Sequence, residues 1–177
     1  LHRRPTDLVE LTRRMVADHQ QPGQQHVVRI VAAREPIDGN WDPNRLERIV
    51  GNLLSNAIKY TPKGRVLVGC RRRGDSVRID VYNTGLGIPA SKKKVIFREF
   101  HRLDEGAKVA RGVGLGLSIV QRIARALDHG LTLDSAPGRG TRFSILVPRA
   151  APLPAMTTAA APRNAPAGQL AGMRLLV

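Results

Sequence analysis

The sequence has few aromatic residues, one cysteine and no long hydrophobic run. Aromatic side chains make up 3% of its 177 residues, so a core would have to consist mainly of Leu, Ile, Val and Ala. Cys70 stands alone, which excludes an internal disulfide and a cysteine metal cluster. No segment reaches the roughly 18 consecutive apolar residues of a membrane-spanning helix, and no signal peptide is recognisable. We expect a cytoplasmic domain whose parent protein could be membrane-anchored.

Acidic residues are also scarce: 14 Asp and Glu stand against 29 Lys and Arg, which gives a net charge of +15. Such a surplus is compatible with nucleic acid, an anionic lipid surface or an anionic ligand as partner. The basic residues are scattered, with short runs only at 71–73 and 92–94. No aromatic residues are interleaved with them for base stacking. We therefore expect solvated basic faces and no specific nucleic-acid binding.

Apolar periodicity predicts one domain over residues 1–150. Asp42 fits the N-cap of the longest helix and Pro43 its first turn. The spacing predicts helices at about 8–16, 43–60, 91–97 and 117–127, strands at about 26–33, 65–72, 76–82, 131–135 and 142–147, and loops around Pro36 and Gly39 and at 103–111. Because helices and strand pairs segregate, we predict an α/β (α+β) two-layer sandwich, in which a mixed, mostly antiparallel sheet carries helices on one face. Residues 151–177 are mostly Ala, Pro and Thr, a composition typical of a linker.

The helix predicted at 43–60 carries an unusual polar face. Asn52, Asn56 and Lys59 lie together on it, because steps of three and four residues stay on one side of a helix. Asparagine is a weak helix former, so two of them in mid-helix call for a reason. An amide oxygen suits Mg²⁺, and a lysine can meet phosphate. A solvated polar face is the alternative.

Two glycine-rich stretches could bind a ligand. Asn83–Pro89 follows a strand, and its paired glycines would let the backbone approach a flat group. Gly112–Gly116 leads into a helix whose free N–H groups would form an anion site. Asn83–Pro89 taken alone could be an ordinary turn. Gly112–Gly116 has neither the Rossmann nor the Walker spacing, and a lone glycine loop is weak evidence. Together with the polar helix face, they make three such elements in one domain, which is much stronger evidence for a binding site than any one of them.

Five segments, in this order, resemble the motifs of the ATP-binding catalytic domain of sensor histidine kinases. Asn52–Pro62 resembles the N box, Asn83–Pro89 the G1 box, Ile96–Asp104 the F box, Gly112–Val120 the G2 box, and Pro137–Phe143 the motif of the final strand pair. The resemblance spans residues 1 to about 149. On these residues the chain is identified as a member of that family, which belongs to the GHKL superfamily and has the Bergerat ATP-binding fold.

The resemblance implies a protein-histidine kinase of a two-component system that uses ATP and Mg²⁺. Asn56 would coordinate Mg²⁺, and Lys59 and Arg102 would neutralise phosphate charge, so these three would be the catalytic residues. Tyr60 would pack on the adenine and Ile88 would line its pocket. The other implied nucleotide contacts are Asn52, Asn83, Gly85, Gly87, Gly112, Gly114, Leu115, Gly116, Leu117 and Thr141. The segment between Arg102 and Arg111 would be a lid over ATP.

Asn83 departs from the family pattern, which has an adenine-reading aspartate at this position. A neutral amide would weaken that hydrogen bond, by about 1.5–3 kcal/mol. Three interpretations follow: weakened but real ATP binding, which we favour, a pseudokinase that regulates a partner with weak or no ATP binding, or an introduced inactivating substitution.

Asn52 separates the chain from the gyrase-like ATPases, which have a glutamate there as the base for water. Without that carboxylate, water activation has no obvious base. Transfer of the γ-phosphate to a protein histidine is therefore favoured over ATP hydrolysis.

The five histidines lack the sequence context of a phosphoacceptor. The expected partners are therefore a histidine-bearing dimerisation domain elsewhere in the parent protein and a response-regulator receiver domain. We expect this chain alone to be monomeric. Gly172–Val177 could begin a receiver domain of a hybrid kinase, or could be an apolar end without meaning.

Overall fold

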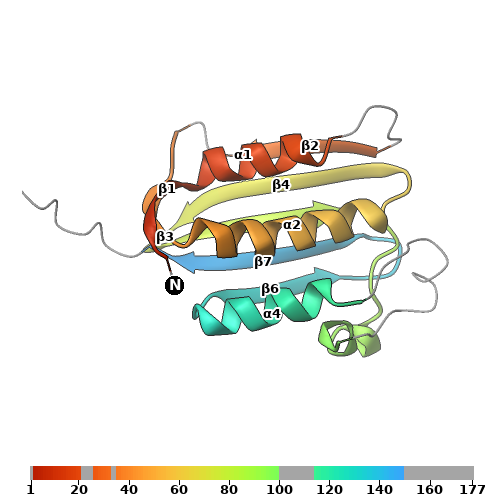
Figure 1. The fold of residues 1–177 in the computed structure, drawn as a ribbon. Helices are drawn as coiled ribbons and strands as arrows, with labels where there is room; N and C mark the ends of the chain where they lie inside the picture. The colour runs from red at the N-terminus through yellow and green to blue at the C-terminus, as the bar shows by residue number, and fades with distance from the viewer. Residues whose placement is uncertain (1, 21–25, 33–34, 100–113, 150–177) are drawn as a thin grey trace, which may run out of the picture.

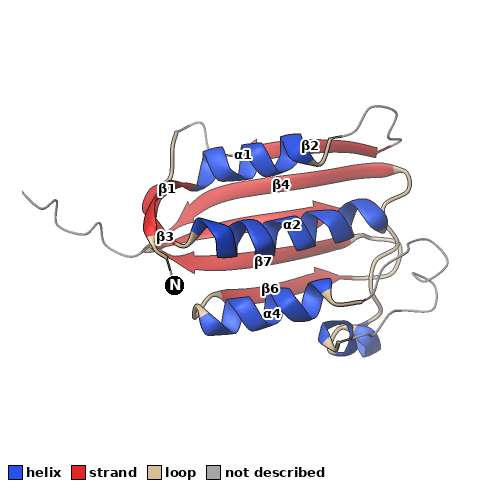
Figure 2. Cartoon of the chain, in the orientation of Figure 1, coloured by secondary structure: helices blue, strands red, loops and turns tan. Residues whose placement is uncertain are grey.

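The computed structural model describes residues 2–20, 26–32, 35–99 and 114–149. Its elements form two layers, with the helices on one face of the sheet (Figures 1 and 2). In chain order they are β1 (Arg4–Asp7), α1 (Leu8–Asp18), β2 (His26–Ala32), β3 (Asp38–Trp41), α2 (Pro43–Lys59), β4 (Gly64–Arg73), β5 (Ser76–Asn83), η1 (Ala90–Lys92), η2 (Val95–Phe97), α4 (Gly116–Ala126), β6 (Gly130–Ser135) and β7 (Thr141–Pro148). Within these ranges, no helix combines the length and the apolar character needed to cross a bilayer.

The main sheet has five strands in the order β2-β4-β5-β7-β6. β2 runs parallel to β4, and the other neighbours are antiparallel. Helices α1, α2 and α4 lie side by side across one face, with α2 in the middle (Figure 1). The predicted fold class, a mixed and mostly antiparallel sheet with helices on one face, is confirmed.

Aspartates cap the first two helices. Asp7 Oδ1 accepts the Val9 N–H at 2.9 Å and also the Ile37 N–H at 3.0 Å, which ties the start of α1 to the segment before β3. Asp42 Oδ1 accepts the Arg45 N–H at 3.2 Å, as predicted for the N-cap of α2. Burial by itself raises the pKa of Asp42, but the N–H groups of His2 and Arg45 outweigh it and lower that pKa below its usual range.

Two local predictions were wrong. The loop predicted around Pro36 and Gly39 contains β3, which pairs with β1 in a separate two-stranded sheet. Trp41 anchors this strand, because its indole is 3% exposed and its Nε1 donates to the Pro148 carbonyl at 2.8 Å. The helix predicted at 91–97 is instead two 3₁₀ turns, η1 and η2. With only Ile96 buried there, packing cannot repay the cost of nucleating an α-helix in so few residues.

The inner face of the sheet and the apolar sides of α1, α2 and α4 form the core. Along β5 the residues alternate strictly between the inner and outer faces, with Val77, Ile79 and Val81 buried. Cys70 of β4 is also buried inside, and burial raises the pKa of its thiol to about 12.

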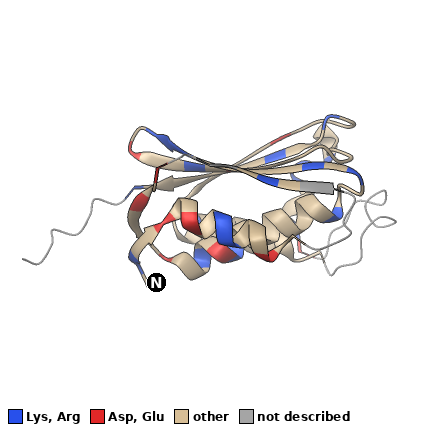
Figure 3. Ribbon diagram, turned by 90° about the horizontal axis from the view of Figure 1, so that it is seen from above, with Lys and Arg blue, Asp and Glu red and all other residues tan. Residues whose placement is uncertain are grey.

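Viewed from above, the sheet and the helices are separate layers, and Lys and Arg are spread over both (Figure 3).

The outer face of the sheet is polar. Asp80 lies at its centre, where it accepts from Arg78 at 3.0 Å and from the Ser144 hydroxyl, with Arg71 at 3.4 Å. These ion pairs are partly solvated, so each contributes little to stability. Burial on the inner face must therefore supply most of the stability of the sheet.

Neighbouring residues of β7 test this asymmetry. Ile145→Ala should lower the free energy of unfolding by about 2–5 kcal/mol, because it leaves a cavity at a fully buried position. Leu146→Ala is the matched control on the outer face, where Leu146 is 39% exposed, and should cost less than about 1 kcal/mol. Urea unfolding measures both, and equal losses would contradict the one-sided core.

Candidate functional site

One end of the molecule gathers most of the predicted site residues. The C-terminal ends of α2, β5 and β6, the start of β7 and the N-terminus of α4 meet there, at the right in Figure 1. Asn83 is the last residue of β5, the central strand, and pairs with Val66 on one side and Thr141 on the other. The sheet register therefore brings two motifs that are 58 residues apart, Asn83 and Thr141, into direct contact.

The Asn83 side chain is 5% exposed and has three polar neighbours. One amide atom lies 2.8 Å from the Thr61 hydroxyl and 3.1 Å from the Gly85 N–H, and the other lies 3.2 Å from the Thr141 carbonyl oxygen. The Gly85 N–H can only donate and the Thr141 carbonyl can only accept. The amide oxygen therefore faces Gly85 and Thr61, and the amide nitrogen faces Thr141, because the reverse orientation would oppose donor to donor and acceptor to acceptor.

Two glycines allow the surrounding loops to close tightly. Gly87 has φ +75°, and a side chain there would lie 1.9 Å from the Ala136 carbonyl oxygen. Gly140 has φ +79°, and a side chain there would lie 2.0 Å from the Asn83 carbonyl oxygen. Any other residue would meet both a strained backbone and a clash. The loop after β5 and the turn between β6 and β7 are thereby held against each other.

Ser135 connects the same two loops. Its hydroxyl accepts the Ile88 N–H at 2.8 Å, donates to the Gly140 carbonyl at 2.8 Å, and lies 2.8 Å from the Thr141 hydroxyl. The predictions from sequence missed both Ser135 and the buried Thr61. Their role depends on cross-strand register and on where α2 ends, and no local pattern marks either of them.

The polar face of α2 meets the N-terminus of α4. A side chain on Gly116 would lie 3.0 Å from Asn52 Oδ1 and 3.5 Å from Asn56 Nδ2. Asn52 turns back along its helix, with its Nδ2 donating to the Arg48 carbonyl at 2.7 Å. Asn56 is half-buried and makes no side-chain hydrogen bond to another residue of the described ranges. Its amide lies at this junction beside Gly116.

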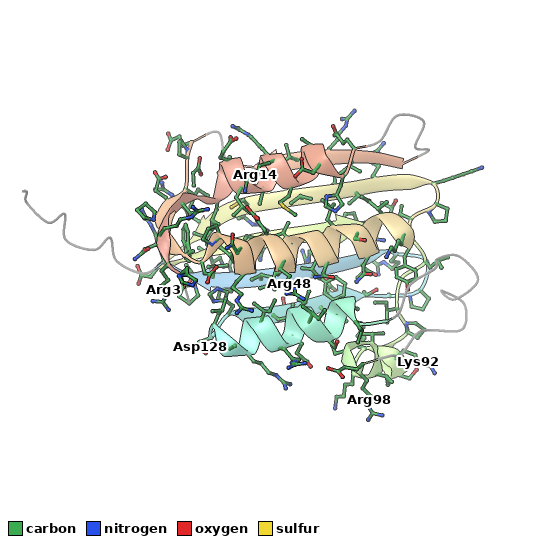
Figure 4. All side chains as sticks on the ribbon, in the orientation of Figure 1. Arg3, Arg14, Arg48, Lys92, Arg98 and Asp128 are labelled. Carbon is green, nitrogen blue, oxygen red and sulfur yellow. The ribbon has the colours of Figure 1, made fainter. Side chains whose placement is uncertain are left out.

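The first turn of α4 faces the same junction. Its first helical bond runs from the Ile119 N–H to the Leu115 carbonyl at 3.1 Å, so the preceding N–H groups have no helical partner. A helix N-terminus of this kind attracts anions. Lys59 is exposed at the end of α2, and Figure 4 shows Lys92 and Arg98 at the same end of the molecule, with Arg3 at the other. This end can hold a polyanion.

Some of the remaining predicted residues lie within the described ranges and others lie outside them. Tyr60, at the C-terminus of α2, accepts the Leu86 N–H through its carbonyl at 3.4 Å, so it borders the loop after β5. Gly114, Leu115 and Leu117 lie at or just before the start of α4. Arg102, Gly112 and the predicted lid at 103–111 lie outside the described residues. The described site residues converge on one end, although they come from four separate motifs.

The profile of the family described as histidine kinase-, DNA gyrase B-, and HSP90-like ATPase matches residues 41–151. The chain belongs to this family. Among curated proteins, it is 39% identical over 114 residues to the sensor histidine kinase RcsC of Escherichia coli, covering 64% of this chain and 12% of that protein. It is 38% identical over 155 residues to the sensor histidine kinase TmoS of Ectopseudomonas mendocina, covering 84% of this chain and 16% of that protein. The chain thus spans a small part of the length of its relatives.

Solved structures show the same relationship. The mycobacterial sensor histidine kinase MprB superposes with a TM-score of 0.71 at 26% identity, covering 83% of this chain and 97% of that one. Full-length ShkA in complex with AMPPNP superposes with a TM-score of 0.76 at 27% identity, covering 85% of this chain and 32% of that one. The chain is a catalytic domain of the sensor histidine kinase type.

Substitutions at two glycines of the β6–β7 turn can distinguish the destabilisation caused by backbone strain from that caused by a steric clash. Gly138 and Gly140 both have positive φ, but a side chain on Gly138 would meet nothing within 4 Å. Gly138→Ala should cost only the left-handed conformation, about 1 kcal/mol. Gly140→Ala should also displace the Asn83 carbonyl and melt about 5 °C or more below Gly138→Ala. Thermal denaturation compares the two, and identical melting temperatures would contradict the tight contact.

Proposed function

We propose that this domain binds Mg²⁺-ATP at the described end and transfers the γ-phosphate to a histidine on a dimerisation domain outside this chain. The observation that carries the proposal is the junction of Asn52 and Asn56 with the N-terminus of α4, at the same end of the molecule as the enclosed Asn83. A purine base would lie at Asn83, and the phosphates would extend toward α4. Phosphoryl transfer requires mainly positioning and charge neutralisation, which this arrangement supplies.

Asn56 suits a magnesium ion in this role. Its amide is half-buried, has no hydrogen bond to another side chain or backbone group of the described residues, and lies beside the anion-attracting turn of α4. Mg²⁺ is usually held by one or two protein oxygens, with phosphates and water completing its shell. Asn56 would supply the protein oxygen. Lys59 and Arg102 would balance the remaining phosphate charge.

Asn52 bears on the kind of reaction. Its amide is committed to the Arg48 carbonyl, and no amide can act as a base at neutral pH. The chain therefore has no group at this position to activate water. Instead, the histidine of the partner domain would attack, so that a bond from its imidazole nitrogen to the γ-phosphorus forms as the bond to the β–γ bridging oxygen breaks. A receiver domain would then accept the phosphoryl group.

The alternative, a pseudokinase or regulatory module with weak or no ATP binding, has no observation of its own to favour it. Asn83 motivated it in the sequence, but the residues around Asn83 form an ordered hydrogen-bond network, with one amide N–H left for a ligand in the proposed site. A site that had lost its function would have no need to keep Gly87, Gly140 and the Ser135 bridge.

Two asparagines on α2 provide a test. Asn56→Ala should weaken Mg²⁺-ATP binding about tenfold or more, since a metal ligand is lost, and should not change binding of ATP measured with EDTA. Asn44→Ala is the matched control, because Asn44 is exposed in the first turn of the same helix, and it should bind like the wild type. Isothermal titration calorimetry measures the affinities. An unchanged affinity of Asn56→Ala would contradict the metal role.

A further inference from the structure

The hydrogen-bonding capacity of the Asn83 amide is almost completely used by the protein. Its oxygen has two acceptor sites, and the Thr61 hydroxyl and the Gly85 N–H occupy both, at 2.8 and 3.1 Å. Its nitrogen has two hydrogens, and one of them goes to the Thr141 carbonyl at 3.2 Å. The other amide hydrogen has no acceptor among the described residues.

The surroundings hold this donor in place. Thr61 is fully buried and Asn83 is 5% exposed, so water cannot easily replace the contacts they make. Turning the amide over would oppose two N–H donors at 3.1 Å and two carbonyl oxygens at 3.2 Å. A buried group left unsatisfied carries the full penalty of losing its contact with water. The amide therefore cannot rotate to present its oxygen to a ligand without breaking its contacts with the Gly85 N–H and the Thr141 carbonyl, although the Thr61 hydroxyl could partner either orientation.

The remaining N–H donor decides which purine fits. The inference rests on the proposed function, which places a purine base at Asn83, and it takes the 6-position of that base as the group that faces the amide. Adenine carries an amino group there, whose hydrogens would point at the Asn83 N–H. Hypoxanthine and guanine carry an oxygen there, which accepts. We propose that Asn83 makes the site selective for 6-oxopurine nucleoside triphosphates over ATP.

A carboxylate at this position would have the opposite effect. Aspartate has nearly the shape of asparagine but only accepts hydrogen bonds, so it would suit the amino group of adenine. It would also place an oxygen near the Thr141 carbonyl, where the amide nitrogen now lies at 3.2 Å. The contacts of this pocket thus suit an amide. In the proposal, an asparagine at position 83 favours a 6-oxopurine, and an aspartate there would favour adenine.

ITP is the sharpest probe, because it differs from ATP only at the 6-position and the adjacent ring nitrogen. Calorimetry in the presence of Mg²⁺ should show the wild-type chain binding ITP about tenfold more tightly than ATP, the effect of replacing a donor–donor contact by a hydrogen bond. Asn83→Asp should reverse the order and bind ATP more tightly. Asn83→Ala, which has no donor and buries no charge, should bind the two nucleotides about equally. Thermal melts confirm that each variant is folded.

The possible failures are distinguishable. ATP binding as tight as or tighter than ITP binding in the wild type would overturn the base preference while leaving the proposed nucleotide site intact. An ITP preference that persists in Asn83→Ala would overturn the role of Asn83. Binding of ATP by Asn83→Asp alone, with neither nucleotide bound by the wild type, would also overturn the preference. If neither the wild type nor any variant binds either nucleotide, the proposed function itself fails.

Discussion

The packing of α2 on the inner face of the sheet is the contact on which the rest of the structure depends. Leu46, Ile49, Val50, Leu53 and Leu54 are each at most 1% exposed, and they fix both the rotation and the height of the helix. With the apolar stripe inside, Asn52 and Asn56 must face α4, and the end of the helix must lie beside the end of β5. A rotation of α2 by one residue would bury the asparagines and dismantle the site.

The candidate site lies at one end of the two-layer sandwich, where helices and strands terminate. Strands and helices cover each other along their length, but their ends carry backbone groups that the layers themselves do not satisfy. At this end the groups are used by side chains and loops: Tyr60 accepts from Leu86, and Ser135 joins Ile88 to Gly140. At the same end, the first N–H groups of α4 have no helical partner. The packed length of the two layers thus supplies stability, and the ends of their elements supply the groups of the proposed binding site.

Much of this could be predicted from the sequence. The caps and apolar stripe of α2 are local signals and placed that helix well, and alternation placed β4, β5, β6 and β7. β3 was missed because Asp38–Trp41 has no apolar alternation and exists only by pairing with β1. The sequence at 91–97 predicts a helix, but because only one of its residues is buried, the segment forms only 3₁₀ turns. Thr61 and Ser135 were missed because their importance lies in what they touch across the fold.

The sequence alone determined the family, the polar face of α2 and the presence of an amide at position 83, since motif identity and helical periodicity are local properties of the chain. Only the tertiary structure decided which way that amide points. The orientation depends on Thr61, Gly85 and Thr141, which come from the end of one helix, the loop after β5 and the neighbouring strand. Their donors and acceptors meet only once the sheet register is set. Together they fix the amide of Asn83 with its oxygen toward Thr61 and Gly85 and its nitrogen toward Thr141.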